Sequence, residues 1–163
     1  MIHRDRDGDI AIVRMERGKV NALDMELLRA LCDEFEALKH TDSRAVVLTG
    51  TGSSFSAGVD LFRVIEGGKA YLDTFLPLLS DAFRAVFDFP GPVIGAANGH
   101  AIAGGAVLLC CCDRRFLVNT QARVGIPELY VGVPFPSVAL EIMRFSVGPD
   151  HLQRVLLLSL IHI

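Results

Sequence analysis

Two stretches far apart in the chain repeat one pattern, in which an apolar run meets a glycine-bearing turn and then a helical pattern. The first reads VVLTGTGSSFSAGVDL (residues 46–61), and the second reads VIGAANGHAIAGGAVLL (residues 93–109). In an open parallel sheet, ligand sites form beyond the carboxyl ends of the strands, where neighbouring loops face one crevice. The repeated pattern therefore predicts an α/β fold in which both turns face a single ligand.

The remaining segments alternate between strand and helix patterns. Strands are expected at residues 9–15, 44–50, 92–98 and 114–118, and helices from about residue 60 and at residues 24–40, 69–87, 104–112 and 137–146. Asp24 is a good N-cap for the first helix, whereas Pro77 is expected to kink or split the helix of residues 69–87. Residues 124–136 are expected to form a loop. Strands that alternate with helices indicate parallel pairing.

The composition excludes several classes of protein. A length of 163 residues suits one domain with a sizeable core, and 51% of the residues are hydrophobic. The formal net charge of -3 offers no basic surface for nucleic acid or for an anionic membrane. The N-terminal sequence MIHRDRDGD lacks the apolar segment of a signal peptide, so the chain is predicted to be cytoplasmic.

Three of the four cysteines are consecutive, at Cys110, Cys111 and Cys112. Adjacent residues of a helix point about 100° apart, so these thiols cannot converge on one metal ion. We therefore expect buried free thiols in a reducing compartment, and we predict no metal site.

One uncharged stretch is long enough to span a bilayer. Residues 92–112 contain no Asp, Glu, Lys or Arg. The same stretch holds Asn98, His100 and four glycines, which weaken a membrane helix and favour a buried strand, turn and helix. We therefore predict no membrane segment.

Two familiar uses of a glycine-rich turn fit the first stretch poorly. The turn has no lysine for a GxxxxGK[ST] phosphate loop, and Phe55 replaces the third glycine of GxGxxG. The sequence SFSAG is one residue short of a G-x-S-x-G nucleophile elbow, which would make Ser56 a nucleophile with His100 or His151 as its base. A turn-forming role for these serines is the stronger interpretation.

A third use engages both turns. Backbone N–H groups at the starts of two helices have no partner within the helix, and adjacent glycines leave them accessible. Two such groups that converge on one carbonyl oxygen form an oxyanion hole, in which each donor contributes about 3 kcal/mol of transition-state stabilisation.

Four motifs closely resemble the enoyl-CoA hydratase/isomerase (crotonase) superfamily in order and spacing. They are KVNALD (residues 19–24), FSAGVDL (residues 55–61), NGHAIAGGAVLLCCCD (residues 98–113) and VGIPELYVGV (residues 124–133). The resemblance covers about residues 8–157. It implies a crotonase-like spiral of ββα units that binds acyl-CoA thioesters, with no metal or redox cofactor and with coenzyme A as part of the substrate. It also implies that the full-length parent is a homotrimer or a dimer of trimers.

The resemblance also implies roles for particular residues. The two oxyanion donors correspond to the N–H groups of Val59 and Gly104. The contacts to the CoA thioester correspond to Val20, Ala22, Ala57, Asp60, Leu61 and Gly105. His100 lies in the second turn and is a further candidate for donating or shuttling a proton.

The reaction depends on two positions that carry glutamates in the hydratases of this family. Val107 occupies the first position and cannot exchange a proton, whereas Glu128 occupies the second. One carboxylate beside an oxyanion hole can remove a C2 proton and return it at C4. The resemblance therefore favours a Δ3,Δ2-enoyl-CoA isomerase with Glu128 as acid/base. The apolar residues Leu129, Val131, Val133 and Phe135 are expected to surround this carboxylate. A hydratase, a hydrolase and a non-catalytic acyl-CoA-binding protein remain as alternatives.

The C-terminal end differs from the family. Residues 1–157 are expected to form an incomplete acyl-CoA-binding core in which the C-terminal trimerisation helices are missing. The sequence LSLIHI (residues 158–163) is expected to be a non-native tail derived from a sequencing-library adapter. Poor solubility and little activity are expected from such a chain, because apolar surface meant for the missing helices would be exposed.

Overall fold

The larger of two sheets has five strands and is mostly parallel. The computed structural model describes residues 1–118, 121–158 and 160–161. The sheet has the order β1-β2-β3-β5-β7 and consists of β1 (Ile2–Asp7), β2 (Ile10–Met15), β3 (Ala45–Gly50), β5 (Val93–Ala97) and β7 (Arg114–Leu117). Only the β1–β2 hairpin is antiparallel. The strands predicted from apolar runs are confirmed, and the N-terminal strand is an addition.

Three of the four strands of the smaller sheet lie within segments that were expected to be turns or loop, and the fourth lies within the predicted tail. Its order is β4-β6-β8-β9, with β4 (Ser54–Ser56), β6 (His100–Ile102), β8 (Val124–Gly125) and β9 (Leu160–Ile161). The strands β4, β6 and β8 run parallel, and β9 is antiparallel to β8. A strand of two or three residues is too short to show the alternation that identifies a strand in a sequence.

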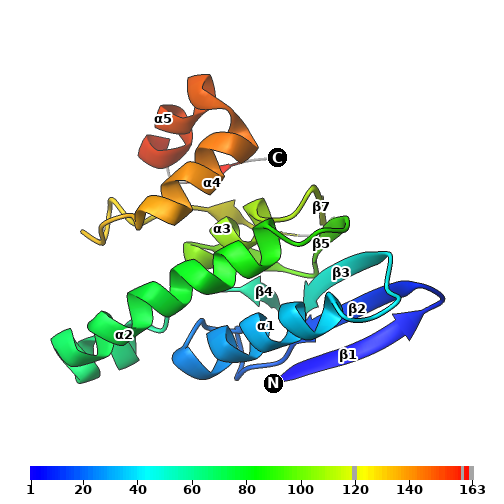
Figure 1. Cartoon of the computed structure of the whole chain (residues 1–163). Coiled ribbons are helices and arrows are strands. Elements are labelled where there is room, and N and C mark those ends of the chain that lie inside the picture. Colours follow the sequence, from blue (N-terminus) through cyan, green and yellow to red (C-terminus); the bar gives the residue numbers. More distant parts are fainter. Residues whose placement is uncertain (119–120, 159, 162–163) are drawn as a thin grey trace.

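Five helices complete the described part of the chain: α1 (Met25–Leu38), α2 (Leu61–Phe87), α3 (Gly104–Cys110), α4 (Ser137–Val147) and α5 (Pro149–Leu158). The helices α1 and α2 lie on the same side of the larger sheet (Figure 1). As predicted, α1 begins after Asp24, whose side chain accepts a hydrogen bond from the Leu27 N–H.

The predicted split of the helix at Pro77 is wrong. The chain leaves the helical conformation at Gly68 (φ 55°, ψ -147°), while Pro77 lies inside the continuous second part of α2. Glycine adopts a positive φ at little steric cost. Phe75 and Leu79 are buried on either side of the proline and hold its turn of the helix against the core.

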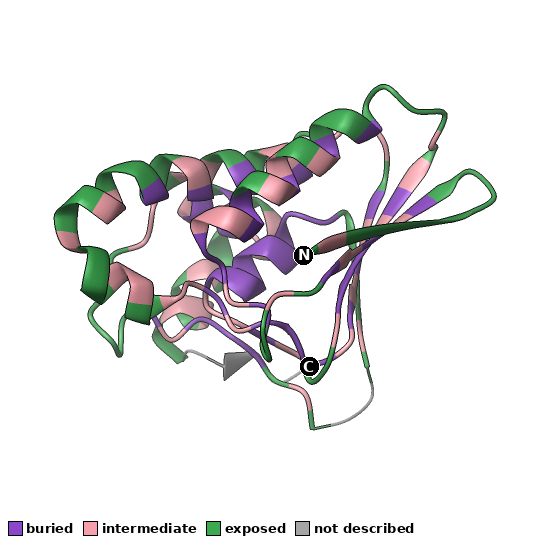
Figure 2. Ribbon diagram, turned by 90° about the horizontal axis from the view of Figure 1, so that it is seen from below, coloured by how far each residue is buried: buried purple, intermediate pink, exposed green. Residues whose placement is uncertain are grey.

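The two sheets are linked by three ββα units. Each unit places one strand in the larger sheet and one in the smaller sheet before its helix: β3-β4-α2, then β5-β6-α3, then β7-β8-α4. This arrangement confirms the predicted spiral of ββα units. Buried residues concentrate between the helices and the sheets (Figure 2).

The uncharged stretch of residues 92–112 forms β5, β6 and α3 in the interior, as predicted. No described helix combines the length and apolar character needed to cross a bilayer. Cys110, Cys111 and Cys112 are buried free thiols, and burial raises the pKa of the Cys112 thiol to about 12.

The predicted tail of residues 158–163 is described only in part. Leu158 is the last residue of α5, and Leu160–Ile161 form β9 beside β8. Residues 159, 162 and 163 lie outside the described part of the chain.

Candidate active site

Three predicted site residues follow the carboxyl ends of three neighbouring parallel strands. Val59 comes after β4, Gly104 after β6 and Glu128 after β8, each two or three residues beyond the strand end. Parallel strands end at the same edge of a sheet, which is where α/β proteins bind their ligands. The smaller sheet therefore brings together residues that are 45 and 24 positions apart in the sequence.

The turns that carry Val59 and Gly104 are in direct contact. A Cβ atom built on Gly58 would lie 3.0 Å from the Gly104 nitrogen. A Cβ atom built on Gly104 would lie 3.7 Å from both the Gly58 Cα and the Val59 Cγ2. Gly58 also has a φ of 85°, so this close approach requires glycine for both its conformation and its size.

The backbone around Val59 is held so that its N–H points away from Leu23, in the segment before α1. The Leu23 N–H donates to the Gly58 carbonyl (2.8 Å), and the Asp60 N–H donates to the Leu23 carbonyl (3.1 Å). In an extended segment the backbone groups of successive residues face opposite sides, so the Val59 N–H faces the side opposite Leu23. Within the described residues, the N–H groups of Val59 and Gly104 have no hydrogen-bond acceptor.

Gly105, which follows the second donor, allows α3 and β4 to pack closely. A Cβ atom on Gly105 would overlap the Ser56 carbonyl group of β4. The structure therefore places Gly105, which the resemblance assigns to substrate binding, at a buried contact between α3 and β4.

Two asparagines hold the loop between β3 and β4. Asn21 is fully buried and donates to the Ser54 carbonyl (2.9 Å). Asn98 accepts from the Gly50 N–H (3.0 Å) and donates to the Gly52 carbonyl (3.0 Å). These bonds replace backbone pairing that the glycine-rich loop lacks.

Glu128 carries a desolvated carboxylate. The residue is only 9% exposed, and its Oε2 atom is buried with no hydrogen-bond partner in the described part of the chain. Burial raises the pKa of the Glu128 carboxyl above its usual range, since the charged form loses its hydration. A carboxylate of this kind is suited to exchanging protons with a substrate near neutral pH.

The predicted apolar neighbours of Glu128 need correction. Leu129 and Val131 are 53% and 58% exposed, so they do not enclose the carboxylate. The chain turns tightly after Glu128, whose carbonyl accepts from the Val133 N–H (3.0 Å). This turn directs the side chains of Leu129 and Val131 to the surface, whereas Val133 and Phe135 are half-buried and Ile126 on the strand side is buried.

The sequence comparisons identify the family. The sequence profile of the enoyl-CoA hydratase/isomerase family matches residues 5–161. The chain belongs to this family. A Thermus thermophilus protein named as a candidate enoyl-CoA hydratase is 38% identical over 136 residues, which are 82% of this chain and 52% of that protein. Human mitochondrial enoyl-CoA delta isomerase 1 is 26% identical over 99% of this chain and 54% of its own length.

Solved structures give the same result for the fold. An enoyl-CoA hydratase/carnitine racemase from Magnetospirillum magneticum superimposes with a TM-score of 0.90 at 28% identity, covering 98% of this chain and 62% of that one. The chain spans about half the length of the Thermus thermophilus and human relatives. Relatives named as hydratases and as isomerases are both among them.

The position that this resemblance assigns to a second glutamate lies in the interior. Val107 is 1% exposed on α3, and its N–H donates to the Ala103 carbonyl (3.2 Å). An aliphatic side chain at a buried site neither binds nor activates water. Of the two positions that carry glutamates in the hydratases of this family, only the position of Glu128 therefore holds a carboxylate in this chain.

Five positions assigned to CoA contacts lie on two adjoining segments. The Ala57 N–H donates to the Val20 carbonyl (2.9 Å), which brings the two segments together beside Ala22. Val20 and Leu61 are 39% and 42% exposed. The Asp60 side chain caps α2 by accepting from the Arg63 N–H (3.2 Å).

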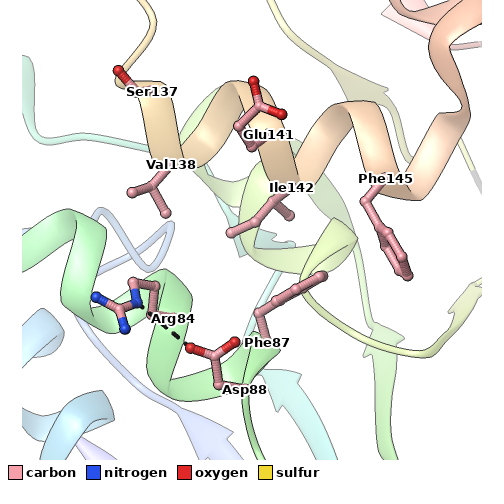
Figure 3. Close-up of a pocket in the computed structure, with 8 residues that line it drawn as sticks. All are labelled: Arg84, Phe87, Asp88, Ser137, Val138, Glu141, Ile142 and Phe145. Carbon is pink, nitrogen blue, oxygen red and sulfur yellow. Dashed lines mark ion pairs between the residues drawn. The ribbon is translucent and has the colours of Figure 1, made fainter.

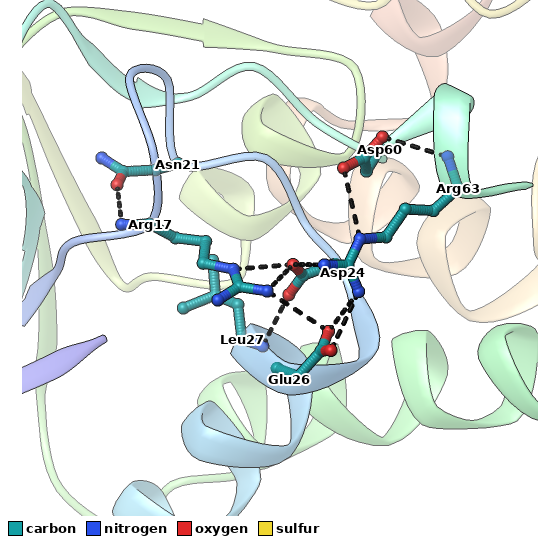
Figure 4. A network of polar contacts seen from close by, with 7 residues as sticks. All are labelled: Arg17, Asn21, Asp24, Glu26, Leu27, Asp60 and Arg63. Atoms are coloured by element: carbon teal, nitrogen blue, oxygen red, sulfur yellow. Dashed lines mark hydrogen bonds and ion pairs between the residues drawn. The ribbon is translucent and has the colours of Figure 1, made fainter.

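A polar network that the sequence analysis missed ties the same segments together (Figure 4). Arg63 forms two hydrogen bonds with Glu26 (2.8 and 2.9 Å), and the Arg17 Nε donates to the buried Asp24 carboxylate (2.7 Å). The partners come from the first turn of α2, the start of α1 and the segment before α1. Arg63 and Glu26 are 37 residues apart, and no local pattern connects such positions.

Neither His100 nor the hollow between α2 and α4 belongs to the group formed by Val59, Gly104 and Glu128. The His100 Nδ1 accepts from the Arg123 N–H (3.1 Å), which gives the ring a structural hydrogen bond. A hollow of about 470 Å³ between α2 and α4 is lined by Phe87, Ile142 and Phe145 among others, and by none of the three site residues (Figure 3).

The serine-nucleophile interpretation has no support in the structure. The Ser56 hydroxyl is fully buried, donates to the Asn21 carbonyl (2.7 Å) and accepts from the Gly58 N–H (3.1 Å). Both of its hydrogen-bonding functions are therefore occupied by the backbone of the two neighbouring segments.

Ser56→Ala is expected to lower the free energy of unfolding by about 1 to 3 kcal/mol, because it leaves a buried donor and a buried acceptor without partners. Urea denaturation measures this change. The wild-type chain is expected to resist labelling by a fluorophosphonate probe, which reacts with activated serines. Labelling of Ser56 would contradict its structural role.

Proposed function

We propose that the chain is the acyl-CoA-binding part of an enoyl-CoA isomerase that moves a double bond from the Δ3 to the Δ2 position. The substrate thioester oxygen accepts hydrogen bonds from the N–H groups of Val59 and Gly104. Glu128 removes a proton from C2, and the resulting enolate is stabilised by the two donors. The same carboxyl group then returns the proton at C4.

One observation carries this proposal. The Oε2 atom of the Glu128 carboxylate is buried and has no hydrogen-bond partner among the described residues, while Val107 fills the other family position with a buried aliphatic side chain. Hydration of a double bond requires a water molecule to be activated and a proton to be delivered, and two carboxylates suit that task. A proton shift within one substrate needs a single group that acts first as base and then as acid.

The two free N–H groups support the oxyanion hole. They lie on turns in contact, and Val59 is fixed in direction by the bonds between Leu23 and its neighbours Gly58 and Asp60. Donors held in place before the substrate arrives need no reorganisation during the reaction.

The alternatives give different products from matched substrates. The chain is expected to convert a 3-enoyl-CoA to the 2-enoyl-CoA faster than it converts a 2-enoyl-CoA to the 3-hydroxyacyl-CoA, with mass spectrometry and chromatography separating the products. Faster hydration would favour a hydratase, and release of free CoA would favour a hydrolase. Calorimetric binding of acyl-CoA without any product would favour a non-catalytic binding protein.

A more sensitive measurement isolates the first chemical step. Deuterium exchange at C2 of a saturated acyl-CoA in D2O requires only the base and the oxyanion donors, and mass spectrometry detects it without complete turnover. We expect exchange at C2 and none at C4 of this substrate, because only the C2 proton is acidified by the thioester. Absence of C2 exchange with acyl-CoA bound would overturn the proposal.

A further inference from the structure

A positive φ in a residue other than glycine occurs beside the candidate site, once in the segment before α1 and once in the turn that carries Gly104. Among the described residues other than glycine, only Asn21 (φ 52°) and Ala103 (φ 54°) have a positive φ. Asparagine tolerates this region because its side chain makes local hydrogen bonds, and the Asn21 Oδ1 accepts from the Arg17 N–H (2.8 Å). Alanine has no such compensation, so the conformation of Ala103 must be imposed by its surroundings.

Ala103 is held from two sides. Its N–H donates to the Gly125 carbonyl of β8 (2.8 Å), and its carbonyl accepts from the N–H groups of Ala106 (2.9 Å) and Val107 (3.2 Å) in α3. The residue therefore lies between a strand and a helix that both constrain its backbone. The sharp turn at Ala103 (φ 54°, ψ -128°) sets the direction of the next N–H group, which is that of Gly104.

The Ala103 methyl group also contacts the first turn. A Cβ atom built on Gly58 would lie 2.7 Å from the Ala103 Cβ, so the methyl group faces the Gly58 Cα. Gly58 directly precedes Val59. One residue thus sets the direction of one donor and lies against the backbone that carries the other.

We propose that Ala103 is a positioning residue, whose strained backbone directs the Gly104 N–H and whose methyl group fixes the spacing between that N–H and the Val59 N–H. This inference rests on the proposed function, because it assigns a purpose to the two donors. Glycine would adopt the same φ without strain, but it would lack the methyl contact and would sample other conformations. The strained conformation of Ala103 therefore lowers stability, and it holds the two donors in place before the substrate binds.

The test compares two identical substitutions on the same segment. Ala103→Gly is expected to lower the rate of C2 exchange about tenfold, to leave the dissociation constant of acyl-CoA unchanged, and to leave the thermal midpoint unchanged or higher. The matched control is Ala106→Gly in α3, where glycine replaces a buried helical alanine. This control is expected to lower the midpoint and to leave the exchange rate of the folded protein unchanged.

The conservative variant Ala103→Ser restores a Cβ atom and is expected to recover most of the lost rate. An unchanged rate in Ala103→Gly would overturn the proposal. A midpoint that falls in Ala103→Gly as it does in Ala106→Gly would also overturn it, because Ala103 would then be an ordinary packing residue.

A second readout does not depend on activity. The amides of Leu23, Asp60 and Ala106 are hydrogen-bonded at the two turns, and their hydrogen exchange is expected to be faster in Ala103→Gly than in the wild type. Unchanged exchange would contradict the positioning role. If the wild-type chain shows no C2 exchange, the proposed function fails, while amide exchange still decides whether Ala103 couples the two turns.

Discussion

Glu128→Gln is expected to lower the rate of C2 exchange and of double-bond isomerisation by about 10²- to 10⁴-fold, because a neutral amide cannot accept the C2 proton. The amide is nearly isosteric with the carboxyl group, so acyl-CoA binding should change little. Mass-spectrometric exchange and a calorimetric titration on the same preparation measure the two quantities. The matched control is Glu141→Gln on α4, where the glutamate side chain is 62% exposed.

The pH dependence of this reaction follows from the direction of the pKa shift. Burial raises the pKa of Glu128, so the active carboxylate forms at a higher pH than it would for an exposed glutamate. The wild-type rate is expected to increase as the pH rises through this raised pKa, and the residual rate of Glu128→Gln is expected not to follow it. The range from about pH 4 to about pH 8 brackets a raised carboxyl pKa. A wild-type exchange rate that does not change over this range would exclude Glu128 as the base.

The raised pKa of Glu128 also affects stability. The ionised carboxylate that increases the reaction rate is expected to lower the stability of the folded protein. A carboxyl group whose pKa is higher in the folded state than in the unfolded state destabilises the folded protein at pH values above the raised pKa. Below the unfolded-state pKa both states are protonated and the effect vanishes. Glu128→Gln is therefore expected to be as stable as the wild type or more stable at neutral pH, and this difference should disappear in acid. A large loss of stability would mean that Glu128 is primarily structural.

Gly105→Ala is expected to lower the free energy of unfolding by about 3 kcal/mol or more, because the added Cβ would overlap the Ser56 carbonyl group. For a chain of this size, such a change lowers the thermal midpoint by about 10 °C. Neither the β4 backbone nor the α3 backbone can rotate away as a side chain can. The smaller sheet and the helix would have to separate, and this would also move the Gly104 N–H.

The neighbouring glycine is the control for this prediction. A Cβ on Gly104 would meet the Leu23 Cδ1 at 3.1 Å, which is the end of a flexible side chain rather than backbone. Gly104→Ala is therefore expected to remain within about 1 kcal/mol of the wild type. Calorimetric scans of the two variants measure the contrast, and equal midpoints would show that α3 is not tightly held against β4.

Local sequence information was sufficient where an element is long or where a motif is specific. The α1 helix could be predicted from the Asp24 cap and from apolar residues at helical spacing, because both signals lie within the helix itself. The buried strands β3 and β5 were visible as apolar runs. The family, and with it the candidate roles of Val59, Gly104 and Glu128, followed from four motifs in the expected order.

Other features arise only from contacts between distant segments. The strands β4, β6 and β8 are too short to show a period, and they are defined by pairing with one another. The helix is not split at Pro77, since the buried neighbours of the proline hold its turn in place. The exposure of Leu129 and Val131 depends on a tight turn after Glu128.

The sequence by itself determined the family, the order of the longer strands and helices, and the residue types available for chemistry, because these are properties of the chain in one dimension. The tertiary structure alone decided that the turns of Val59 and Gly104 touch, that the Glu128 carboxylate is desolvated, and that Ala103 is held in a strained conformation. Each of these depends on distance, burial or backbone direction. Such quantities take a value only when strands far apart in the chain are packed side by side.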